Sequence, residues 1–292
     1  MKEVQSAGAR FRQALSAHSP LQIVGAPNAL SAIMAKKVGF KALYLSGGAL
    51  SAFTYGVPDL GILTLENFLI EVNRITEAVD TPLLVDIDTG FGSAFNIERT
   101  IKLMIKAGAA AVHIEDQISA KRCGHRPNKE LVSVEEMVDR IRVAHASKTD
   151  PSFFILARTD AISVEGLEQA VLRAKAYEAA GADAIFAESC VSLDGYKAFV
   201  SALKIPVLAN LTEFGSTPLF TVQELASVGV KMALYPFAAT RMMNQAALRT
   251  YETILHKGTQ KELLGAMQTR EAMYEFLHYH DYETRLDQML RK

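Results

Sequence analysis

Two carboxylates stand two residues apart at the end of an apolar run, LLVDID at 83–88. If this run is a strand, Asp86 and Asp88 point to the same side, where their charges repel unless a cation or a proton separates them. Glu115 ends another apolar run and could complete an oxygen-rich site. Oxygen ligands without a nearby His or Cys pair favour Mg²⁺ or Mn²⁺ over zinc. A D-x-D motif is common by chance, but at a strand end facing another carboxylate it predicts a divalent-cation site.

A basic loop with one cysteine follows Glu115. Residues 117–131 read QISAKRCGHRPNKEL, and the thiol is surrounded by Lys121, Arg122, His125, Arg126 and Lys129. Because nearby cations favour the thiolate, we expect a depressed pKa for Cys123, which would make it a ready proton donor or nucleophile. Gly124 would give the loop freedom to close over a bound anion. The alternative is a solvated basic loop with an incidental thiol.

Several groups could hold the carboxylates of a substrate. Arg158, Arg241 and Arg270 are candidates for paired hydrogen bonds, although the pattern places only Arg158, near the end of an apolar run. The segment Ser46–Gly48 offers backbone N–H groups to a ligand. No Lys lies within the strands inferred below, which argues against a Schiff-base aldolase. The chemistry indicated is that of a polyanionic small molecule held on a divalent cation.

The elements that must position these residues follow a repeat. Four segments have a glycine in second position and reach Ser46, Glu115, Glu188 or Pro236 seven residues later: VGFKALYLS (38–46), AGAAAVHIE (107–115), AGADAIFAE (180–188) and VGVKMALYP (228–236). A helix that ends at a left-handed glycine and leads into a buried strand has this pattern. Four further apolar runs fill the gaps: LQIVG (21–25), LLVDID (83–88), FFILART (153–159) and VLANL (207–211).

Eight such runs with helical stretches between most of them predict an α/β fold, a (β/α)8 TIM-type barrel over about residues 20–240. A doubly wound sheet is the rival, but its fingerprint G-x-G-x-x-G is absent. Residues 238–292 contain no strand candidate and are expected to be helical. We therefore expect a single barrel domain over 1–292, with a C-terminal helical extension that packs partly against a partner subunit.

Active sites of such barrels lie at the C-terminal strand ends. Here those ends carry Ser46, Asp86, Asp88, Glu115, Asp116, Arg158, Glu188 and Asn210. Each one alone could be a helix cap or part of an ordinary salt bridge. Burying so many polar and charged groups is costly unless they are paired or bind a ligand, so the set as a whole favours a functional site.

The composition argues against several other classes. The 292 residues contain 31 Lys and Arg against 32 Asp and Glu, a net charge of −1, whereas nucleic-acid binders usually have a basic excess. No apolar stretch is long enough to span a membrane, and the charged segment 1–15 lacks the apolar core of a signal peptide. Two cysteines cannot form a disulfide framework. We expect a cytoplasmic protein.

The motif KRCGH at 121–125 resembles the signature of the isocitrate lyase and phosphoenolpyruvate mutase superfamily. Along the chain the resemblance is strongest to the 2-methylisocitrate lyase branch. It rests on YLSGGA, VPDLGI, LLVDIDTGFG, HIEDQ, KRCGHRPNK, ARTDA, LANLTEFG and MALYP between residues 44 and 236, and on TQKELLGAMQTR at 259–270. True isocitrate lyases are much longer and carry insertions that this chain lacks.

The resemblance implies a Mg²⁺-dependent lyase that cleaves (2S,3R)-2-methylisocitrate to pyruvate and succinate in the methylcitrate cycle of propionate catabolism. It implies that Asp86 and Asp88 hold the metal, that Asp59 and Glu115 act largely through bound water, and that Cys123 protonates carbon. It also implies a homotetramer whose C-terminal helices are exchanged between subunits. The residues implied to contact substrate are Ser46, Gly47, Gly48, Cys123, Gly124, Arg158, Glu188, Asn210, Leu211, Thr212, Arg241 and Arg270.

The residue that accepts the proton of the substrate hydroxyl is not decided by the sequence. Tyr44 is a candidate because its position in the repeat points it into the barrel lumen. The same strand period places Phe186, Leu234 and Pro236 in the lumen near the metal, and an apolar patch there would suit a substrate with an extra methyl group. Ordinary barrel packing is the alternative, above all for Leu234.

Other reactions on the same scaffold remain open at this point. Phosphonopyruvate mutase, carboxyphosphonoenolpyruvate mutase and oxaloacetate decarboxylase share the metal carboxylates but do not need a protonating cysteine. A non-catalytic barrel that only senses a carboxylate is a rival from a different class, and the charges collected at the strand ends argue against it.

Overall fold

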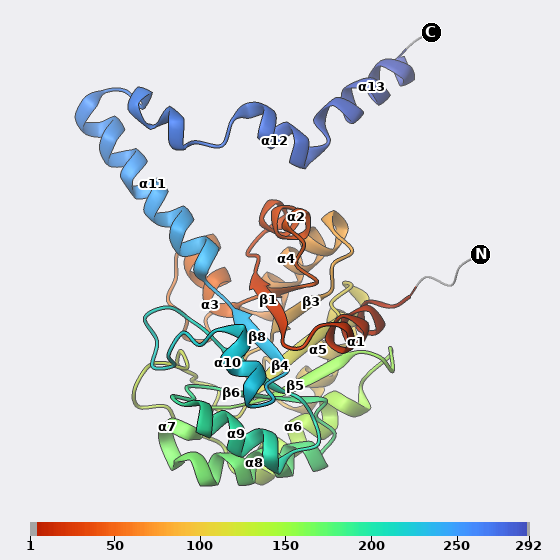
Figure 1. Ribbon diagram of the computed structural model, residues 1–292. Helices are drawn as coiled ribbons and strands as arrows, with labels where there is room; N and C mark the ends of the chain where they lie inside the picture. Colours follow the sequence, from red (N-terminus) through yellow and green to blue (C-terminus); the bar gives the residue numbers. More distant parts are fainter. Residues whose placement is uncertain (1–4, 291–292) are drawn as a thin grey trace. The chain divides into compact units, whose positions relative to one another are not determined.

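The computed structural model describes residues 5–290 (Figure 1). The first four residues of the charged N-terminal segment therefore lie outside the described residues. By its internal contacts the chain divides into two compact units, Met1–Ala238 and Ala239–Lys292. Among residues 5–290 we find no helix that is both long and apolar enough to cross a membrane.

The first unit contains a closed parallel barrel in which the eight strands follow one another in chain order (Figure 1). β1 closes the barrel by pairing with β8, with Leu21 opposite Met232. This closure confirms the TIM-type barrel and excludes the doubly wound sheet, whose edge strands stay open. The strands are β1 (Leu21–Gly25), β2 (Ala42–Leu45), β3 (Leu83–Asp86), β4 (Ala111–Glu115), β5 (Phe154–Thr159), β6 (Ala184–Ala187), β7 (Val207–Asn210) and β8 (Met232–Tyr235).

The repeated glycines end helices, as their pattern predicts. Gly39, Gly108, Gly181 and Gly229 have positive φ angles of 115°, 87°, 105° and 87°. Glycine adopts this left-handed conformation without the steric cost that a Cβ would bring. Each glycine therefore lets the chain leave a helix and turn into the following strand.

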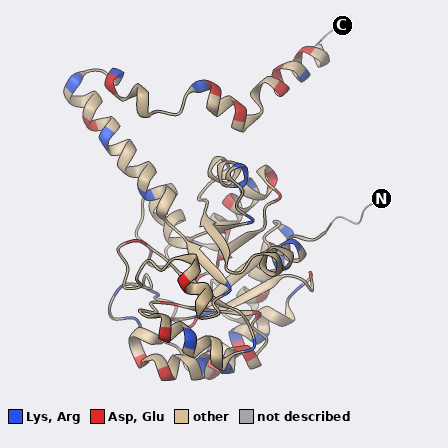
Figure 2. Ribbon diagram, in the orientation of Figure 1, with Lys and Arg blue, Asp and Glu red and all other residues tan. Residues whose placement is uncertain are grey.

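Helices on the outside of the barrel bury a second hydrophobic layer against the strands. Basic and acidic residues are interspersed over their outer surfaces, in keeping with the small net charge (Figure 2). The helices of this unit are α1 (Ala7–Ala17), α2 (Ala29–Val38), α3 (Gly47–Ala49), the π-helix η1 (Leu50–Tyr55), α4 (Leu65–Ala78), α5 (Ala94–Lys106), α6 (Val134–Ala146), α7 (Ile162–Glu165), α8 (Leu167–Ala179), α9 (Leu193–Ala202) and α10 (Val222–Ser227).

The barrel lumen is packed with apolar side chains below the strand ends. Phe11 of α1 is fully buried against Phe154 at the start of β5, with ring centroids 5.1 Å apart. Tyr44, Phe186 and Leu234 belong to the same lumen cluster. α1 therefore contributes to the apolar packing at the N-terminal end of β5.

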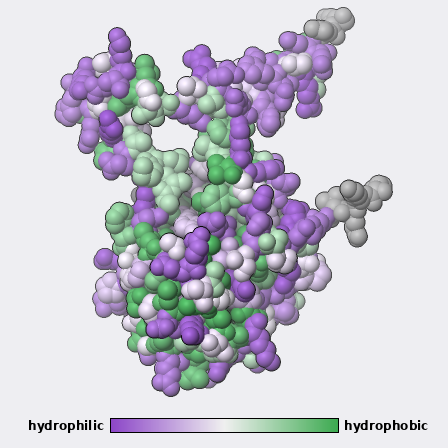
Figure 3. Space-filling model, viewed as in Figure 1, coloured by the Kyte–Doolittle hydropathy of each residue, from purple (hydrophilic) through white to green (hydrophobic). Residues whose placement is uncertain are grey.

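The second unit is helical, as predicted for the residues after 240. It contains most of α11 (Ala238–Lys257), a 3-10 helix η2 (Lys261–Ala266), α12 (Arg270–Leu277) and α13 (Tyr279–Leu290). Hydrophobic and hydrophilic residues both lie on its surface (Figure 3). Large exposed apolar side chains on α11 are Met242, Met243, Leu248, Tyr251, Ile254 and Leu255.

Candidate active site

Asp86, the last residue of β3, is held by two backbone amides. Its Oδ2 accepts a hydrogen bond from Gly47 N at 3.0 Å, and its Oδ1 accepts one from Asp88 N at 3.0 Å. A Cβ on Gly47 would lie only 2.9 Å from Asp86 Oδ2, so a larger residue would crowd this contact. Asp88 lies beyond the end of β3 and has a φ of 47°. The expectation that both aspartates belong to one strand and therefore face the same side is wrong. A turn, rather than a strand, places Asp88 beside Asp86.

Lys121 of the KRCGH motif brings a positive charge to these carboxylates. Its Nζ lies 2.7 Å from Asp88 Oδ1 and also forms an ion pair with Asp59. Burial raises the pKa of Asp88 to about 6, although the charge of Lys121 acts in the opposite direction. Burial alone would lower the pKa of Lys121, but the surrounding carboxylates outweigh it and raise that pKa, so the lysine stays charged.

Glu115, the last residue of β4, has a buried carboxylate with open acceptor positions. Neither oxygen receives a hydrogen bond from the described residues, and the ion pair with Arg158 joins Oε2 to Nη1 at 3.3 Å. Burial raises the pKa of Glu115 well above its ordinary value. A cation or an ordered water would satisfy these oxygens.

This donor set fits a hard cation that keeps part of its water shell. Asp86 and Asp88 supply neighbouring carboxylates, and Glu115 adds two oxygens with unused acceptor capacity. Within residues 5–290, no three His, Cys, Asp or Glu side chains lie close enough to hold a metal ion together. Mg²⁺ usually retains several waters and binds through one or two carboxylates, whereas structural zinc takes four protein ligands. The arrangement therefore suits Mg²⁺.

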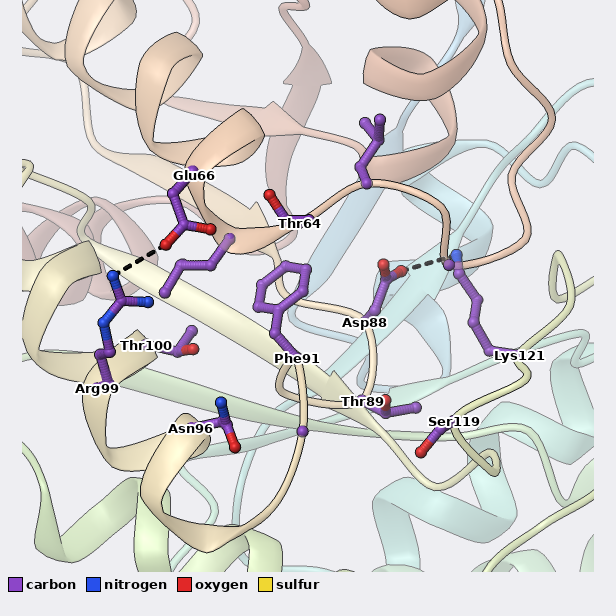
Figure 4. Close-up of a pocket in the computed structure, with 14 residues that line it drawn as sticks. Thr64, Glu66, Asp88, Thr89, Phe91, Asn96, Arg99, Thr100, Ser119 and Lys121 are labelled. Atoms are coloured by element: carbon purple, nitrogen blue, oxygen red, sulfur yellow. Dashed lines mark hydrogen bonds and ion pairs between the residues drawn. The ribbon is translucent and has the colours of Figure 1, made fainter.

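A cavity of about 380 Å³ with both polar and apolar walls lies beside Asp88 and Lys121 (Figure 4). The ion pair between Glu66 and Arg99 forms another part of its wall. Polar walls of this kind can hold ordered water close to a carboxylate. Further polar lining residues are Thr64, Thr89, Asn96, Thr100 and Ser119.

Arg158 on β5 is the centre of a buried network of carboxylates. Its Nε donates to Asp160 Oδ2 at 2.9 Å, and its Nη2 donates to Asp160 Oδ1 at 3.1 Å. Nη2 also lies 3.4 Å from Glu188 Oε2. Burial alone would raise the pKa of Glu188, but the charges of Arg158 and His125 outweigh it and hold that pKa far below its ordinary value. Both groups therefore stay charged at neutral pH, which suits the recognition of a polar, anionic ligand.

The KRCGH loop packs onto this network through Gly124. A Cβ on Gly124 would lie 2.5 Å from Arg158 Nη2 and 2.6 Å from Glu188 Oε2. The next residue, His125, places its Nε2 3.1 Å from Glu188 Oε1. Cys123 is partly exposed and lies beside Gly124 at the mouth of the site. The close approach explains why the residue after the cysteine is a glycine.

The expected depression of the Cys123 pKa is wrong. Burial raises the pKa of this thiol above its ordinary value, and the charges of Asp59 and Glu188 add to the effect. Two cations of the loop are directed to carboxylates, Lys121 to Asp88 and Lys129 to Asp160. Cys123 is therefore a protonated thiol at neutral pH, which suits a proton donor better than a nucleophile.

Tyr44 points into the lumen and shares a hydrogen bond with His113. Tyr44 Oη lies 2.8 Å from His113 Nε2, and the same nitrogen lies 3.6 Å from Asp86 Oδ1. Burial raises the pKa of Tyr44 well above its ordinary value and lowers that of His113 to about 4, so both are neutral at pH 7. The ring of Phe186 packs edge-on against His113, with ring centroids 5.1 Å apart. The guanidinium carbon of Arg158 lies 5.3 Å from the centroid of the Phe186 ring.

The remaining candidates of the first unit lie at or near the C-terminal strand ends. Ser46 caps the following helical segment, accepting a hydrogen bond from Ala49 N at 3.3 Å. Asn210 Nδ2 donates to Glu188 Oε2 at 3.3 Å. Leu211 packs in the layer between strands and helices, so its side chain faces away from the lumen. Also buried in this region are Gly48, Thr212, Leu234 and Pro236.

Arg241 on α11 and Arg270 on α12 belong to the second compact unit. Both residues are exposed. Their contact with substrate stays a prediction.

Sequence reasoning missed Asp160, and it gave Lys121 and Lys129 only as cations around Cys123, although the fold buries all three in the site. Asp160 follows Arg158 by two residues, and strand alternation could have placed both on one side. Lys129 has no comparable local signal, because it is one of several cations in the loop. Its role depends on how the loop folds back onto the barrel.

A closed parallel barrel with paired aspartates, a buried arginine and a cysteine loop at its C-terminal strand ends defines an enzyme of the TIM-barrel class. Comparison with known families is more specific. The profile of the family described as phosphoenolpyruvate phosphomutase matches residues 11–255. The chain belongs to this family.

Curated relatives narrow the assignment further. The chain is 57% identical over 285 residues to a 2-methylisocitrate lyase of Shewanella oneidensis, and the match covers 98% of both chains. It is 54% identical over 290 residues to a 2-methylisocitrate lyase of Escherichia coli, covering 99% of this chain and 98% of the relative. These relatives confirm the predicted lyase branch.

Solved structures of the superfamily share the fold. A 2,3-dimethylmalate lyase superposes with a TM-score of 0.89 at 32% identity, covering 98% of this chain and 96% of the other. Phosphonopyruvate hydrolase in complex with oxalate and Mg²⁺ superposes with a TM-score of 0.87 at 31% identity, covering 98% and 100%. Different reactions therefore occur on this scaffold, so the fold alone does not choose among them.

Proposed function

We propose that the protein cleaves (2S,3R)-2-methylisocitrate to pyruvate and succinate, as a Mg²⁺-dependent lyase. The observation that carries this proposal is the full-length identity of 57% and 54% to two 2-methylisocitrate lyases. The Mg²⁺ complex of phosphonopyruvate hydrolase supports the choice of cation, for which Mn²⁺ could substitute. The reaction would serve propionate catabolism through the methylcitrate cycle, in the cytoplasm.

In this proposal Asp86 and Asp88 hold the cation, and Asp59 and Glu115 act through water. When bound, the cation supplies positive charge that polarises the substrate hydroxyl and a neighbouring carboxylate. Arg158 and Asn210 bind substrate carboxylates, assisted by the backbone amide of Gly48, since the amides of Gly47 and Ala49 already donate to Asp86 and Ser46. Residues that complete the substrate site are Gly47, Gly48, Gly124, Glu188, Leu211 and Thr212.

The proposed cleavage needs one group that accepts a proton from the substrate hydroxyl and one that donates a proton to carbon. The substrate hydroxyl loses a proton, the adjacent C–C bond breaks, and pyruvate is released while the bond's electron pair passes to the succinate carbon. Arg158 stabilises the negative charge that develops on the carboxylate next to that carbon. Cys123 then donates its proton to the carbon to give succinate. A thiol with a raised pKa holds this proton until the carbanion forms.

Tyr44 is our candidate for moving the hydroxyl proton. Its own pKa is too high for it to act as a phenolate, but His113 is neutral and shares a 2.8 Å hydrogen bond with it. Tyr44 can therefore accept a proton while its own passes to His113. Beside His113, the apolar Phe186 would form the pocket for the substrate methyl group together with Leu234 and Pro236.

We further propose a homotetramer in which C-terminal helices are exchanged between subunits. Apolar side chains exposed on a helix usually mark a contact with another protein surface, and α11 carries six large ones. Arg241 and Arg270 would contact substrate carboxylates in this assembly. Light scattering should give the mass of four chains of 31.9 kDa, and the mass of a monomer would contradict the proposal.

The decisive assay measures pyruvate released from 2-methylisocitrate with Mg²⁺, with EDTA as a control and isocitrate as the competing substrate. The proposal requires metal-dependent pyruvate and poor use of isocitrate. No pyruvate from folded protein would refute it, and phosphonopyruvate and oxaloacetate would then be assayed. A Cys123→Ser variant should lose turnover, because serine is a far weaker acid than the thiol.

A further inference from the structure

Two buried charged residues near the site have no task in the proposed reaction. Lys129 lies in the same loop as the KRCGH motif, and Asp160 directly follows β5. Their relative exposures are 7% and 0%. A buried charge is costly unless it is paired and hydrogen-bonded, so the contacts of these residues indicate what they do.

Lys129 connects the loop to the barrel. Its Nζ lies 2.8 Å from Asp160 Oδ1 and donates to the carbonyl oxygen of Gly124 at 2.5 Å. Ser189 Oγ donates to the same carbonyl oxygen at 3.0 Å. The backbone of Gly124, one residue after Cys123, is therefore held by two donors, of which the charged one is the stronger.

Asp160 serves both the loop and the arginine with one carboxylate. Its Oδ1 accepts hydrogen bonds from Lys129 and from Arg158 Nη2, and its Oδ2 accepts one from Arg158 Nε. Its own backbone N donates to Asp116 Oδ1 at 2.9 Å, which fixes it to the end of β4. Burial alone would raise the pKa of Asp160, but the charges of Arg158 and Lys129 outweigh it, so the group stays ionised.

We propose that Asp160 and Lys129 are positioning residues that couple the docked state of the KRCGH loop to the orientation of Arg158. Asp160 fixes the guanidinium through two hydrogen bonds. Lys129 is bound by the same carboxylate and donates a hydrogen bond to the Gly124 carbonyl. This hydrogen bond holds Gly124 in close contact with Arg158 and Glu188. Cys123 is thereby set at one position relative to a substrate bound by Arg158.

This proposal rests on the proposed function in one respect, namely that Cys123 protonates a substrate carbon. Its test therefore uses a readout that needs no substrate, the rate at which iodoacetamide alkylates Cys123. The Cys190→Ser background leaves Cys123 as the single thiol, since the sequence has two cysteines. A docked loop protects the thiol by burial, and a loop that opens more often exposes it.

Lys129→Met removes both contacts of the ammonium while keeping an unbranched side chain. Of these two contacts, the one with Asp160 joins the loop to the barrel, and its loss should raise the alkylation rate by about tenfold. Asp160→Asn keeps the shape of the side chain and should raise the rate by about threefold. The matched control is Lys148→Met. It also removes a lysine paired with an aspartate, Asp183 at 3.4 Å, but this partly buried pair lies just before strands β5 and β6. Its alkylation rate should equal that of the parent.

Steady-state kinetics supply the second readout. Lys129→Met should lower kcat with KM changed by less than about threefold, because Arg158 keeps its hydrogen bonds to Asp160. Asp160→Asn should lower kcat and raise KM together, since the arginine loses its charged partner. Lys148→Met should keep both constants.

Unchanged alkylation in both Lys129→Met and Asp160→Asn would overturn the coupling, whatever substrate the enzyme uses. An equal increase in Lys148→Met would overturn it as well, because the effect would then be general loosening. If Lys129→Met does not fold, the alkylation rate of the near-isosteric Asp160→Asn variant alone tests the coupling. Altered alkylation in an enzyme that releases no pyruvate would leave the coupling intact and refute only the proposed reaction.

Discussion

Replacing Gly124 by alanine tests the contact between the loop and the Arg158–Glu188 pair. A Cβ here would lie 2.5 Å from Arg158 Nη2, whereas ordinary contact begins at 3.4 Å. The loop or the ion pair must therefore move by about 0.9 Å, the difference 3.4 − 2.5. The backbone of Gly124 is not in the left-handed region, so an alanine adds no strain of its own.

We expect a catalytic defect with little loss of stability. A displacement of about 1 Å in a catalytic arrangement can cost on the order of 100-fold in rate. That factor corresponds to about 2.7 kcal/mol of transition-state stabilisation. The kcat for pyruvate release should fall accordingly. The free energy of unfolding should change by no more than about 0.5 kcal/mol, because the loop can undock without disturbing the barrel.

Gly108→Ala is the matched control. Gly108 has a φ of 87° and ends the helix before β4, at the opposite end of the barrel from the site. Alanine in this conformation should cost about 1–3 kcal/mol of stability and leave kcat unchanged. Wild-type kcat in Gly124→Ala would refute the idea that the loop docks on the Arg158–Glu188 pair during turnover. Equal kcat losses in the two variants would show that the defect is not local.

Three further predictions concern the thiol, the methyl pocket and the metal. In Cys190→Ser, alkylation of Cys123 should still be rising at pH 9, because its pKa lies above the ordinary 9.0 and only the thiolate reacts; a plateau below pH 8 would contradict this. Phe186→Trp should shrink the pocket and weaken kcat/KM for methylisocitrate by about 10–200-fold, whereas unchanged kinetics would remove Phe186 from it. Asp88→Asn should weaken Mg²⁺ binding measured calorimetrically more than Asp59→Asn does, and equal affinities would exclude a direct role for Asp88.

The barrel could be predicted from local patterns because its strands are repeats of one unit. Gly39, Gly108, Gly181 and Gly229 mark helix ends that need a left-handed residue, and this requirement is visible in the sequence. The strands that follow are buried on both faces, so they appear as continuous apolar runs. Eight such units are the number that a (β/α)8 barrel needs. The observed barrel, closed with its strands in chain order, agrees with this prediction.

The polar site was only partly predictable, because charge interactions depend on distances between loops. The basic residues around Cys123 suggested a low pKa, but in the fold Lys121 turns to Asp88 and burial dominates at the thiol. Lys129 and Asp160 lie 31 positions apart, so no local pattern joins them. The turn that places Asp88 beside Asp86 was likewise read as a continuation of the strand.

The sequence by itself determined the barrel and the residues at its strand ends, because these depend on residue types and on a spacing of seven from each repeat glycine. The lyase branch was indicated by the resemblance of motifs such as KRCGH to a known family. Only the tertiary structure decided the protonation states and the hydrogen-bond partners. Solvent exclusion at Glu115, Cys123 and Asp88 raises their pKa values, and burial is a property of the packed fold. The docking of Gly124 on Arg158 is likewise a contact between distant segments, which forms when the loop after β4 folds over the end of β5.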